Sequence, residues 1–235
     1  MNEPVEITEG VWVLHNPTLM LNTGILTAGG AAVVVDPPSA EADISVIRKG
    51  LAQQGLGLAG IVFTRRDSDA SEGWSDSPLL GEPVISGTAP LSEHAPGWEI
   101  IPLGPSASGL YNASTRVLFC GQLLTATGAG ELLPYISEGS RWYLDALAAV
   151  AELDPKVLVP AVGSLARGKR AIRKRIEDDR SYVYDVRRLV ISSIMGEVTL
   201  DRVLQVTADL HEDFARLEEH LANIRGVWSE LSASD

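Results

Sequence analysis

The sequence predicts an α/β protein, because strand-like and helix-like segments interleave in both halves of the chain. The chain has 235 residues, a length that fits one large domain better than two small ones. Apolar residues make up 45% and charged residues 21%, close to the average for a soluble globular protein. We therefore predict a single domain over residues 1–235, with a helical C-terminal extension over about 199–231.

Short apolar runs bounded by turn residues predict the strands. Gly29-Gly30 fits a tight hairpin, Pro37-Pro38 ends a strand because proline has no N–H to donate, and Asn112–Ser114 fits a turn. The strands expected are residues 10–14, 20–28, 31–36, 58–64, 82–86, 98–103, 109–111, 116–120 and 156–161.

Apolar residues at a period of three to four predict the helices. Ser140 is expected to cap one of them. In the last helix, apolar residues recur at every third or fourth position from Val203 to Leu231. This seam packs on its own domain, or part of it makes a homodimer contact. The helices expected are residues 40–54, 140–153, 164–194 and 199–231.

The charge balance is acidic, with 19 Lys and Arg against 31 Asp and Glu, giving a net charge of −12. A field of that sign repels nucleic acids and anionic lipid surfaces, so we expect neither nucleic-acid nor membrane partners. The acidic, polar start is not a signal peptide, and no apolar run reaches the ~18 residues of a membrane span. We therefore expect a cytoplasmic protein. The single cysteine, Cys120, excludes an intramolecular disulfide.

The strand over 58–64 runs directly into TRRDSDASEG, from Thr64 to Gly73. This segment resembles the T-H-x-H-x-D-H-x-x-G motif of the metallo-β-lactamase superfamily, whose histidines and aspartate hold one or two metal ions, usually zinc. Thr64, Asp69 and Gly73 match the motif. The three histidine positions hold Arg65, Asp67 and Ala70.

Further segments resemble the same superfamily in order and spacing. Asn22–Gly24 and the run ending at Asp36 resemble its N-terminal hairpin. VLFCGQLL has Gln122 where the family has a metal-bridging aspartate. VLVPAVGS has Val162, and PLGPSASGLY has Pro105, where the family has histidines. The resemblance implies the four-layer αββα sandwich of the metallo-β-lactamase fold.

Of the ligands that the resemblance implies, only Asp69 remains. Zinc binds imidazole, thiolate or carboxylate, whereas Arg65 is always charged and cannot ligate metal. We therefore expect no metal cofactor, the alternative being a weak Mg²⁺ or Ca²⁺ site on Asp67 and Asp69. The positions with no donor side chain are Ala70, Pro105 and Val162.

The chain has four histidines, and all lie outside these motifs. His15 belongs to a segment that in the family overhangs the mouth of the active site, so it is a candidate catalytic residue. A surface or hydrogen-bonded structural role is the alternative for His15 and the default for His94, His211 and His220.

The former metal cleft has two interpretations. In the structural one, Arg65 takes the place of the metal and neutralises Asp69, whose burial without a partner costs several kcal/mol. In the functional one, arginines bind an anionic ligand through paired hydrogen bonds and a carboxylate or His15 acts as general base. The candidate ligand-binding residues are Arg65, Arg66, Ser106 and Gln122, and the candidate catalytic residues are Asp67, Asp69, Arg66 and His15.

Two other features are weaker candidates. Cys120 is a possible nucleophile, although a lone cysteine is more often a small buried apolar residue. Six basic residues between Arg167 and Arg175 form either a solvated helix face or a docking patch for a phosphate-bearing group.

Our leading hypothesis is a divergent metallo-β-lactamase-fold protein that binds a small acyl or anionic metabolite in the former active-site cleft, with no bound metal. Any hydrolysis, cyclisation or elimination there is then metal-independent. The alternative is a non-catalytic pseudoenzyme that acts as a scaffold or regulatory partner. An ordinary metal-dependent hydrolase is a third hypothesis, which the ligand replacements disfavour.

Overall fold

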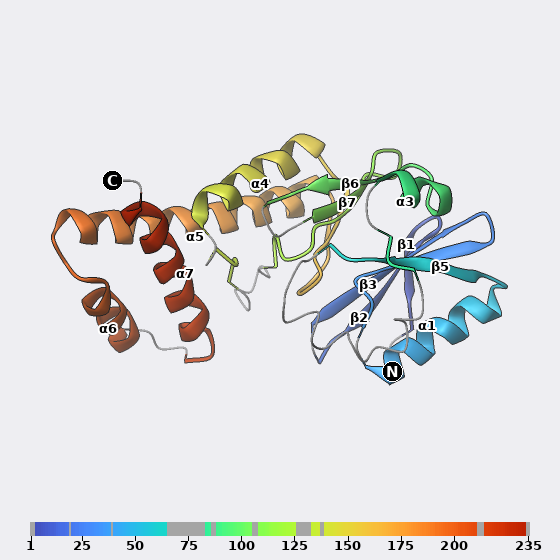
Figure 1. The fold of residues 1–235 in the computed structure, drawn as a ribbon, viewed down its shortest axis with the longest axis horizontal. Coiled ribbons are helices and arrows are strands. Elements are labelled where there is room, and N and C mark those ends of the chain that lie inside the picture. The colour runs from blue at the N-terminus through green and yellow to red at the C-terminus, as the bar shows by residue number, and fades with distance from the viewer. Residues whose placement is uncertain are drawn as a thin grey trace. The chain divides into compact units, whose positions relative to one another are not determined.

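The computed structural model describes residues 3–18, 20–38, 40–64, 83–85, 88–104, 108–125, 133–136, 139–210 and 214–233. The chain divides into two compact units, shown in Figure 1. The sandwich unit comprises Met1–Gln122 and Pro155–Gly168, and the helical unit comprises Leu123–Asp154 and Lys169–Asp235. That the two units form a single domain stays a prediction.

The sandwich unit contains two mixed sheets of five strands each (Figure 1). In both, one neighbouring pair is parallel, β4 with β5 and β8 with β9, and the described remaining pairs are antiparallel. The first sheet has the order β1 (Val5–Thr8), β2 (Val11–Asn16), β3 (Leu21–Ala28), β4 (Ala31–Val35), β5 (Gly57–Val62). The second has the order β10 (Ala166–Arg167), β9 (Val157–Val159), β8 (Val117–Phe119), β7 (Ser108–Asn112), β6 (Trp98–Pro102).

Alternation along the strands divides the core into two layers, because successive side chains of a strand point to opposite faces. On β4, Val33 and Val35 join a cluster with Phe119 and Val159 of the second sheet. Ala32 and Val34 join the opposite cluster, with residues of α1 (Glu41–Gln53). The sheets therefore pack face to face, and α1 covers the outer face of the first.

The hairpin and most of the strand predictions for this unit are confirmed. The strand expected over 82–86 is not: within the described residues 83–85, Val84 makes only an isolated bridge with Ile61. Gly29 and Gly30 both have positive φ in the β3–β4 turn, as a two-residue hairpin requires. Asn112 Oδ1 accepts hydrogen bonds from the backbone N–H groups of Ser114 and Thr115, at 3.1 and 2.9 Å, and so builds the predicted turn. Three elements were not predicted, because they are short or lack a clear apolar period: β1, β10 and α3 (Thr88–His94).

The helical unit contains α4 (Ser140–Leu153), α5 (Lys169–Met195), α6 (Leu200–Leu210) and α7 (Phe214–Ser232). The prediction of one continuous final helix is wrong. Instead, α6 and α7 are separate helices that pack against each other (Figure 1), with residues 211–213 outside the described range. The apolar seam is divided accordingly: Val203 and Ile224 are buried, whereas Val206 is 37% exposed.

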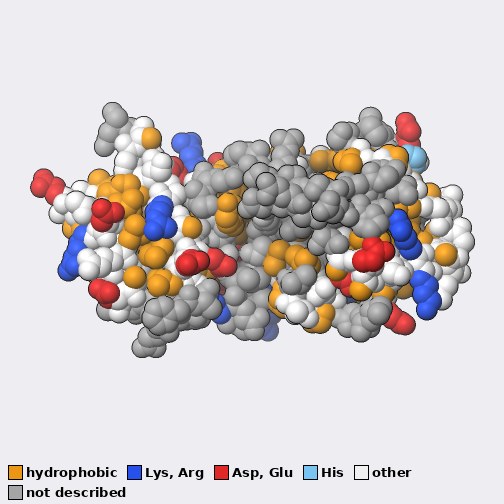
Figure 2. Space-filling view, turned by 60° about the horizontal axis from the view of Figure 1, so that its bottom comes forward, with side chains coloured by type: hydrophobic (Ala, Val, Ile, Leu, Met, Phe, Trp, Pro, Cys, Tyr) orange, Lys and Arg blue, Asp and Glu red, His pale blue; other side chains and the backbone are white. Residues whose placement is uncertain are grey.

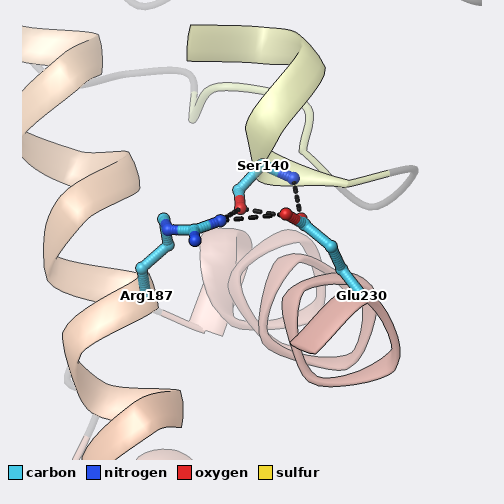
Figure 3. A network of polar contacts seen from close by, with 3 residues as sticks. All are labelled: Ser140, Arg187 and Glu230. Atoms are coloured by element: carbon cyan, nitrogen blue, oxygen red, sulfur yellow. Dashed lines mark hydrogen bonds and ion pairs between the residues drawn. The ribbon is translucent and has the colours of Figure 1, made fainter. Parts of the chain in front are cut away.

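Ser140 begins α4, and its hydroxyl does not cap the helix as predicted. Instead, Glu230 of α7 accepts hydrogen bonds from the Ser140 backbone N–H at 2.5 Å and from its hydroxyl at 2.8 Å (Figure 3). Arg187 of α5 donates to the same hydroxyl and forms an ion pair with Glu230 at 2.9 Å. Burial raises the pKa of Glu230, but the bonds from Ser140 and Arg187 outweigh it and lower that pKa overall. One carboxylate thus joins three helices.

Asp179 of α5 is fully buried and accepts a hydrogen bond of 2.6 Å from the Tyr143 hydroxyl. Its second oxygen, Oδ1, is one of two buried polar side-chain atoms that have no hydrogen-bond partner among the described residues. Burial raises the pKa of Asp179 to about 7, although the Tyr143 bond and the charge of Arg175 lower it. Below about pH 7, the Asp179 carboxyl group is therefore mostly neutral in the folded state.

We expect the stability of the helical unit to fall as pH rises from about 4 to about 7, because the folded state holds a proton on Asp179 that the unfolded state releases. Asp179→Asn keeps an acceptor for Tyr143 and removes this dependence. At high pH the substitution removes the cost of holding an ionised carboxylate at this buried position, which is up to about 4 kcal/mol. The amide N–H of the new side chain has no partner, and this offsets about half of the gain. Denaturant unfolding near pH 8 should therefore show a gain of about 2 kcal/mol.

Asp185→Asn is the matched control, because Asp185 is exposed and forms an ion pair with Arg188 at 3.3 Å. This control should leave stability within about 0.5 kcal/mol of wild type. A pH profile of Asp179→Asn that parallels wild type would show that Asp179 ionises normally in the folded protein.

The surface of the described residues is mixed. On the face in Figure 2, acidic, basic and hydrophobic side chains lie interspersed. Within the described part of the chain, no helix has the length and apolar character needed to span a membrane.

Candidate functional site

Several strands of the sandwich unit end close together, and two buried polar residues join them there. Asp36 follows β4, and Thr64 follows β5. Asp36 Oδ1 accepts a hydrogen bond from the Thr64 backbone N–H at 2.8 Å, and Oδ2 accepts one from the Thr64 hydroxyl. The Asp36 carbonyl also accepts a bond of 2.9 Å from the Thr23 hydroxyl. Asp36 thus fixes the position of Thr64 beside the end of β4.

The two sheets approach each other closely at Thr64. Its carbonyl accepts a hydrogen bond of 3.1 Å from the backbone N–H of Ser108 in the second sheet. Gly121, after β8, has φ +59°, and a Cβ there would lie 2.5 Å from the same carbonyl oxygen. Gly121 is therefore required both for its backbone conformation and for this close approach.

His15 is tied to the same edge through Asn22. The Asn22 side-chain N–H₂ donates to the carbonyls of Pro160 and Gly163, both at 2.7 Å, so Oδ1 is the atom 2.8 Å from His15 Nδ1. An amide oxygen only accepts, so His15 Nδ1 carries a proton, and in the neutral ring Nε2 has the lone pair. Pro160 and Gly163, whose carbonyls accept from Asn22, lie on either side of Val162 in the sequence. Val162 is where the resemblance implies a metal-binding histidine.

The structure describes only part of the predicted site. His15 and Gln122 are described and half-buried. The other candidates lie outside the described residues, so their roles stay predictions: Arg65, Arg66, Asp67, Asp69 and Ser106. Cys120 is fully buried, which suits the structural interpretation of this residue.

The remaining histidines and the basic segment are partly clarified. His220 Nδ1 lies at hydrogen-bonding distance, 2.8 Å, from the Tyr182 hydroxyl, which agrees with a structural role. His94 ends α3, and His211 lies outside the described residues. Arg175 is buried and donates to the Leu124 carbonyl at 3.3 Å, so it does not belong to a surface patch.

The donor chemistry of the described edge does not match a zinc centre. Val162 has no donor atom, and Gln122 offers an amide in place of a carboxylate. Among the residues that the structure describes, no three His, Cys, Asp or Glu side chains are grouped so as to hold a metal ion.

Sequence reasoning missed the roles of Asn22 and Asp36, although both stood in segments that resemble the family. Their side chains act on residues far away in sequence: Asn22 on 160–163, and Asp36 on Thr64. The available signal was a polar residue in or next to a strand that is expected to be buried. A buried polar side chain needs a hydrogen-bond partner.

Two mixed sheets packed face to face, with helices outside them and further helices at the C-terminus, define the fold. The chain has the metallo-β-lactamase fold, and the predicted αββα sandwich is confirmed.

Three solved structures illustrate the match. A β-lactamase domain protein from Burkholderia ambifaria has a TM-score of 0.65 at 16% identity, covering 98% of this chain and 88% of that one. A metallo-β-lactamase family protein from Thermus thermophilus has a TM-score of 0.65 at 12% identity, covering 97% and 95%. DIM-1 metallo-β-lactamase has a TM-score of 0.59 at 16% identity, covering 77% and 98%. No family model and no curated protein matches the sequence, which is consistent with strong divergence.

Proposed function

We propose that this chain binds a small acyl or otherwise anionic metabolite at the strand-end edge of the sandwich unit, without a bound metal ion. The observation that carries the proposal is the replacement of every histidine of the family motifs, of which only the replacement by Asp67 keeps a side chain that can ligate metal. The five positions hold Arg65, Asp67, Ala70, Pro105 and Val162. At positions 65 and 67 a charged side chain stands where the family has a neutral imidazole ligand. An arginine that replaces a metal ion still attracts anions, through directed N–H donors.

Any reaction at this edge is metal-independent in our proposal. Arg65 and Arg66 bind the anionic group, with Ser106 and Gln122 as further hydrogen-bonding residues. Asp67, Asp69 or His15 acts as general base. His15 is supported by its hydrogen bond to Asn22, since a histidine held in one tautomer presents a defined basic nitrogen. The proposal includes a cytoplasmic location, which a chain with a single cysteine suits.

Asp69→Asn and Arg66→Gln, made singly, test whether this edge is the working part. In a deletion strain complemented with each variant, we expect the function to be lost while folding is retained. Arg173→Gln is the matched control, because Arg173 is an exposed arginine on α5. If both site variants fold and complement as well as the control, the edge is not the functional site.

The tautomer of His15 is a separate prediction that needs no ligand. Nitrogen NMR of the protein at about pH 8 should show a neutral ring protonated at Nδ1. In Asn22→Leu, which has no side-chain oxygen to accept from His15 Nδ1–H, the ring should no longer be held in this tautomer. A wild-type ring protonated at Nε2 would contradict the proposed role of this nitrogen as a base.

A partner role for the helical unit is the second candidate function, and we propose a homodimer through the C-terminal helices. Large apolar side chains are exposed there, among them Met195 at 81% and Ile191 at 41%, and hydrophobic side chains are visible on this unit in Figure 2. Light scattering should then show twice the 25.1 kDa chain mass, whereas a monomer at all concentrations would contradict the proposal.

A further inference from the structure

A pocket of about 710 Å³ opens on one side of the sandwich unit. It lies where β1, an edge strand of the first sheet, and β10, an edge strand of the second, both contribute residues. All of its lining residues belong to the sandwich unit. His15 is among them, so the pocket shares one residue with the proposed site.

One part of the pocket is apolar. Val5 and Ile7 of β1 both line this part, and Val5 pairs in register with Val13 of β2. Leu165, just before β10, completes this surface. Val13 is buried, but Val5 is 60% exposed, so apolar area remains that a ligand can cover.

The other part is polar and contains His15, Ser164 and Arg167. Arg167 is exposed, always charged, and has the planar donor geometry that matches a carboxylate. Asn22 holds His15 with its Nδ1 proton engaged at 2.8 Å, which leaves Nε2 as the acceptor nitrogen of the neutral ring. The pocket thus combines an apolar wall, a fixed cation and an oriented imidazole.

We propose that this pocket binds a small monocarboxylic acid with an apolar tail. The carboxylate pairs with Arg167, and the tail packs on Val5, Ile7, Val13 and Leu165. Glu3 also lines the pocket, and its like charge favours ligands with a single negative charge. This inference gives a ligand class to the proposed function, and it rests on that function only for the role of His15.

Hexanoate is the probe, titrated into the full chain by calorimetry with protein NMR as a second readout. We expect saturable binding to wild type, with shifts at Val5, Val13 and Leu165. Arg167→Gln should weaken binding about tenfold, the loss expected for one charge-assisted pair. Glu3→Gln should tighten it, and hexan-1-ol, which has no carboxylate, should bind at least about tenfold more weakly than hexanoate.

Arg173→Gln is again the control, because Arg173 is exposed and does not line the pocket. No saturable binding of hexanoate, or equal affinity in the Arg167 and Arg173 variants, overturns the pocket proposal. The variant His15→Gln distinguishes a failure of the pocket proposal from a failure of the proposed function. Hexanoate binding that depends on Arg167, together with full complementation by His15→Gln, supports the pocket and contradicts the catalytic role of His15.

Discussion

Replacing Asp36 with alanine is expected to lower the free energy of unfolding of the sandwich unit by about 3–4 kcal/mol. Asp36 and Thr64 are 5% and 1% exposed, so water does not replace the lost acceptor. The variant leaves the Thr64 backbone N–H and hydroxyl without the carboxylate oxygens that now accept from them. Each buried donor left without a partner costs about 1–3 kcal/mol. Denaturant unfolding followed by tryptophan fluorescence measures the loss.

Asp36→Asn is the matched control. Its carbonyl oxygen still accepts from the Thr64 N–H, and the Thr64 hydroxyl can rotate to accept from the new amide. We expect a loss of about 1 kcal/mol, well below that of the alanine variant. Equal losses in the two variants, or a loss under about 0.5 kcal/mol with alanine, would show that this pair does not hold the strand ends together.

Gly121→Ala is expected to destabilise the same unit by about 3 kcal/mol. Its φ of +59° costs a residue with a Cβ about 1 kcal/mol or more. The new methyl group would also lie 2.5 Å from the Thr64 carbonyl oxygen, which is backbone and cannot rotate away. Such overpacking costs about 1–3 kcal/mol. The same unfolding experiment gives the change.

Gly50→Ala provides the contrast, because at this position of α1 a Cβ would have no described atom within 4 Å apart from its chain neighbours and the helix's own backbone. Alanine is the better helix former by about 0.8–1 kcal/mol, so this variant should be at least as stable as wild type. If Gly121→Ala matches Gly50→Ala, the close approach of the sheets at Thr64 is incorrect.

Much of the fold could be predicted because its determinants are local. Apolar alternation and the Gly29-Gly30 turn are visible within a few residues, and they predicted the β3–β4 hairpin. The final helices were harder, since the apolar spacing from Val203 to Leu231 is the same for one long helix as for two packed ones. The contacts between α6 and α7 are tertiary, and sequence periodicity does not report them.

The site was predicted less completely, because its organisation depends on partners distant in sequence. Motif resemblance led to His15 and Gln122 as candidates, but no local pattern connects His15 to Asn22 and then to the carbonyls of Pro160 and Gly163. The same holds for Glu230, which caps α4 from the far end of the chain. Such long-range hydrogen bonds become visible only once the strands and helices are placed.

The central claim is that this metallo-β-lactamase fold works without a metal ion at its former active site. Metal analysis of protein purified without added chelator, before and after dialysis against zinc, tests the claim most directly. We expect well under one zinc or iron per chain in both samples, because arginine, alanine, proline and valine stand at four of the five histidine positions and aspartate at the fifth. One tightly held zinc or iron per chain would contradict the claim.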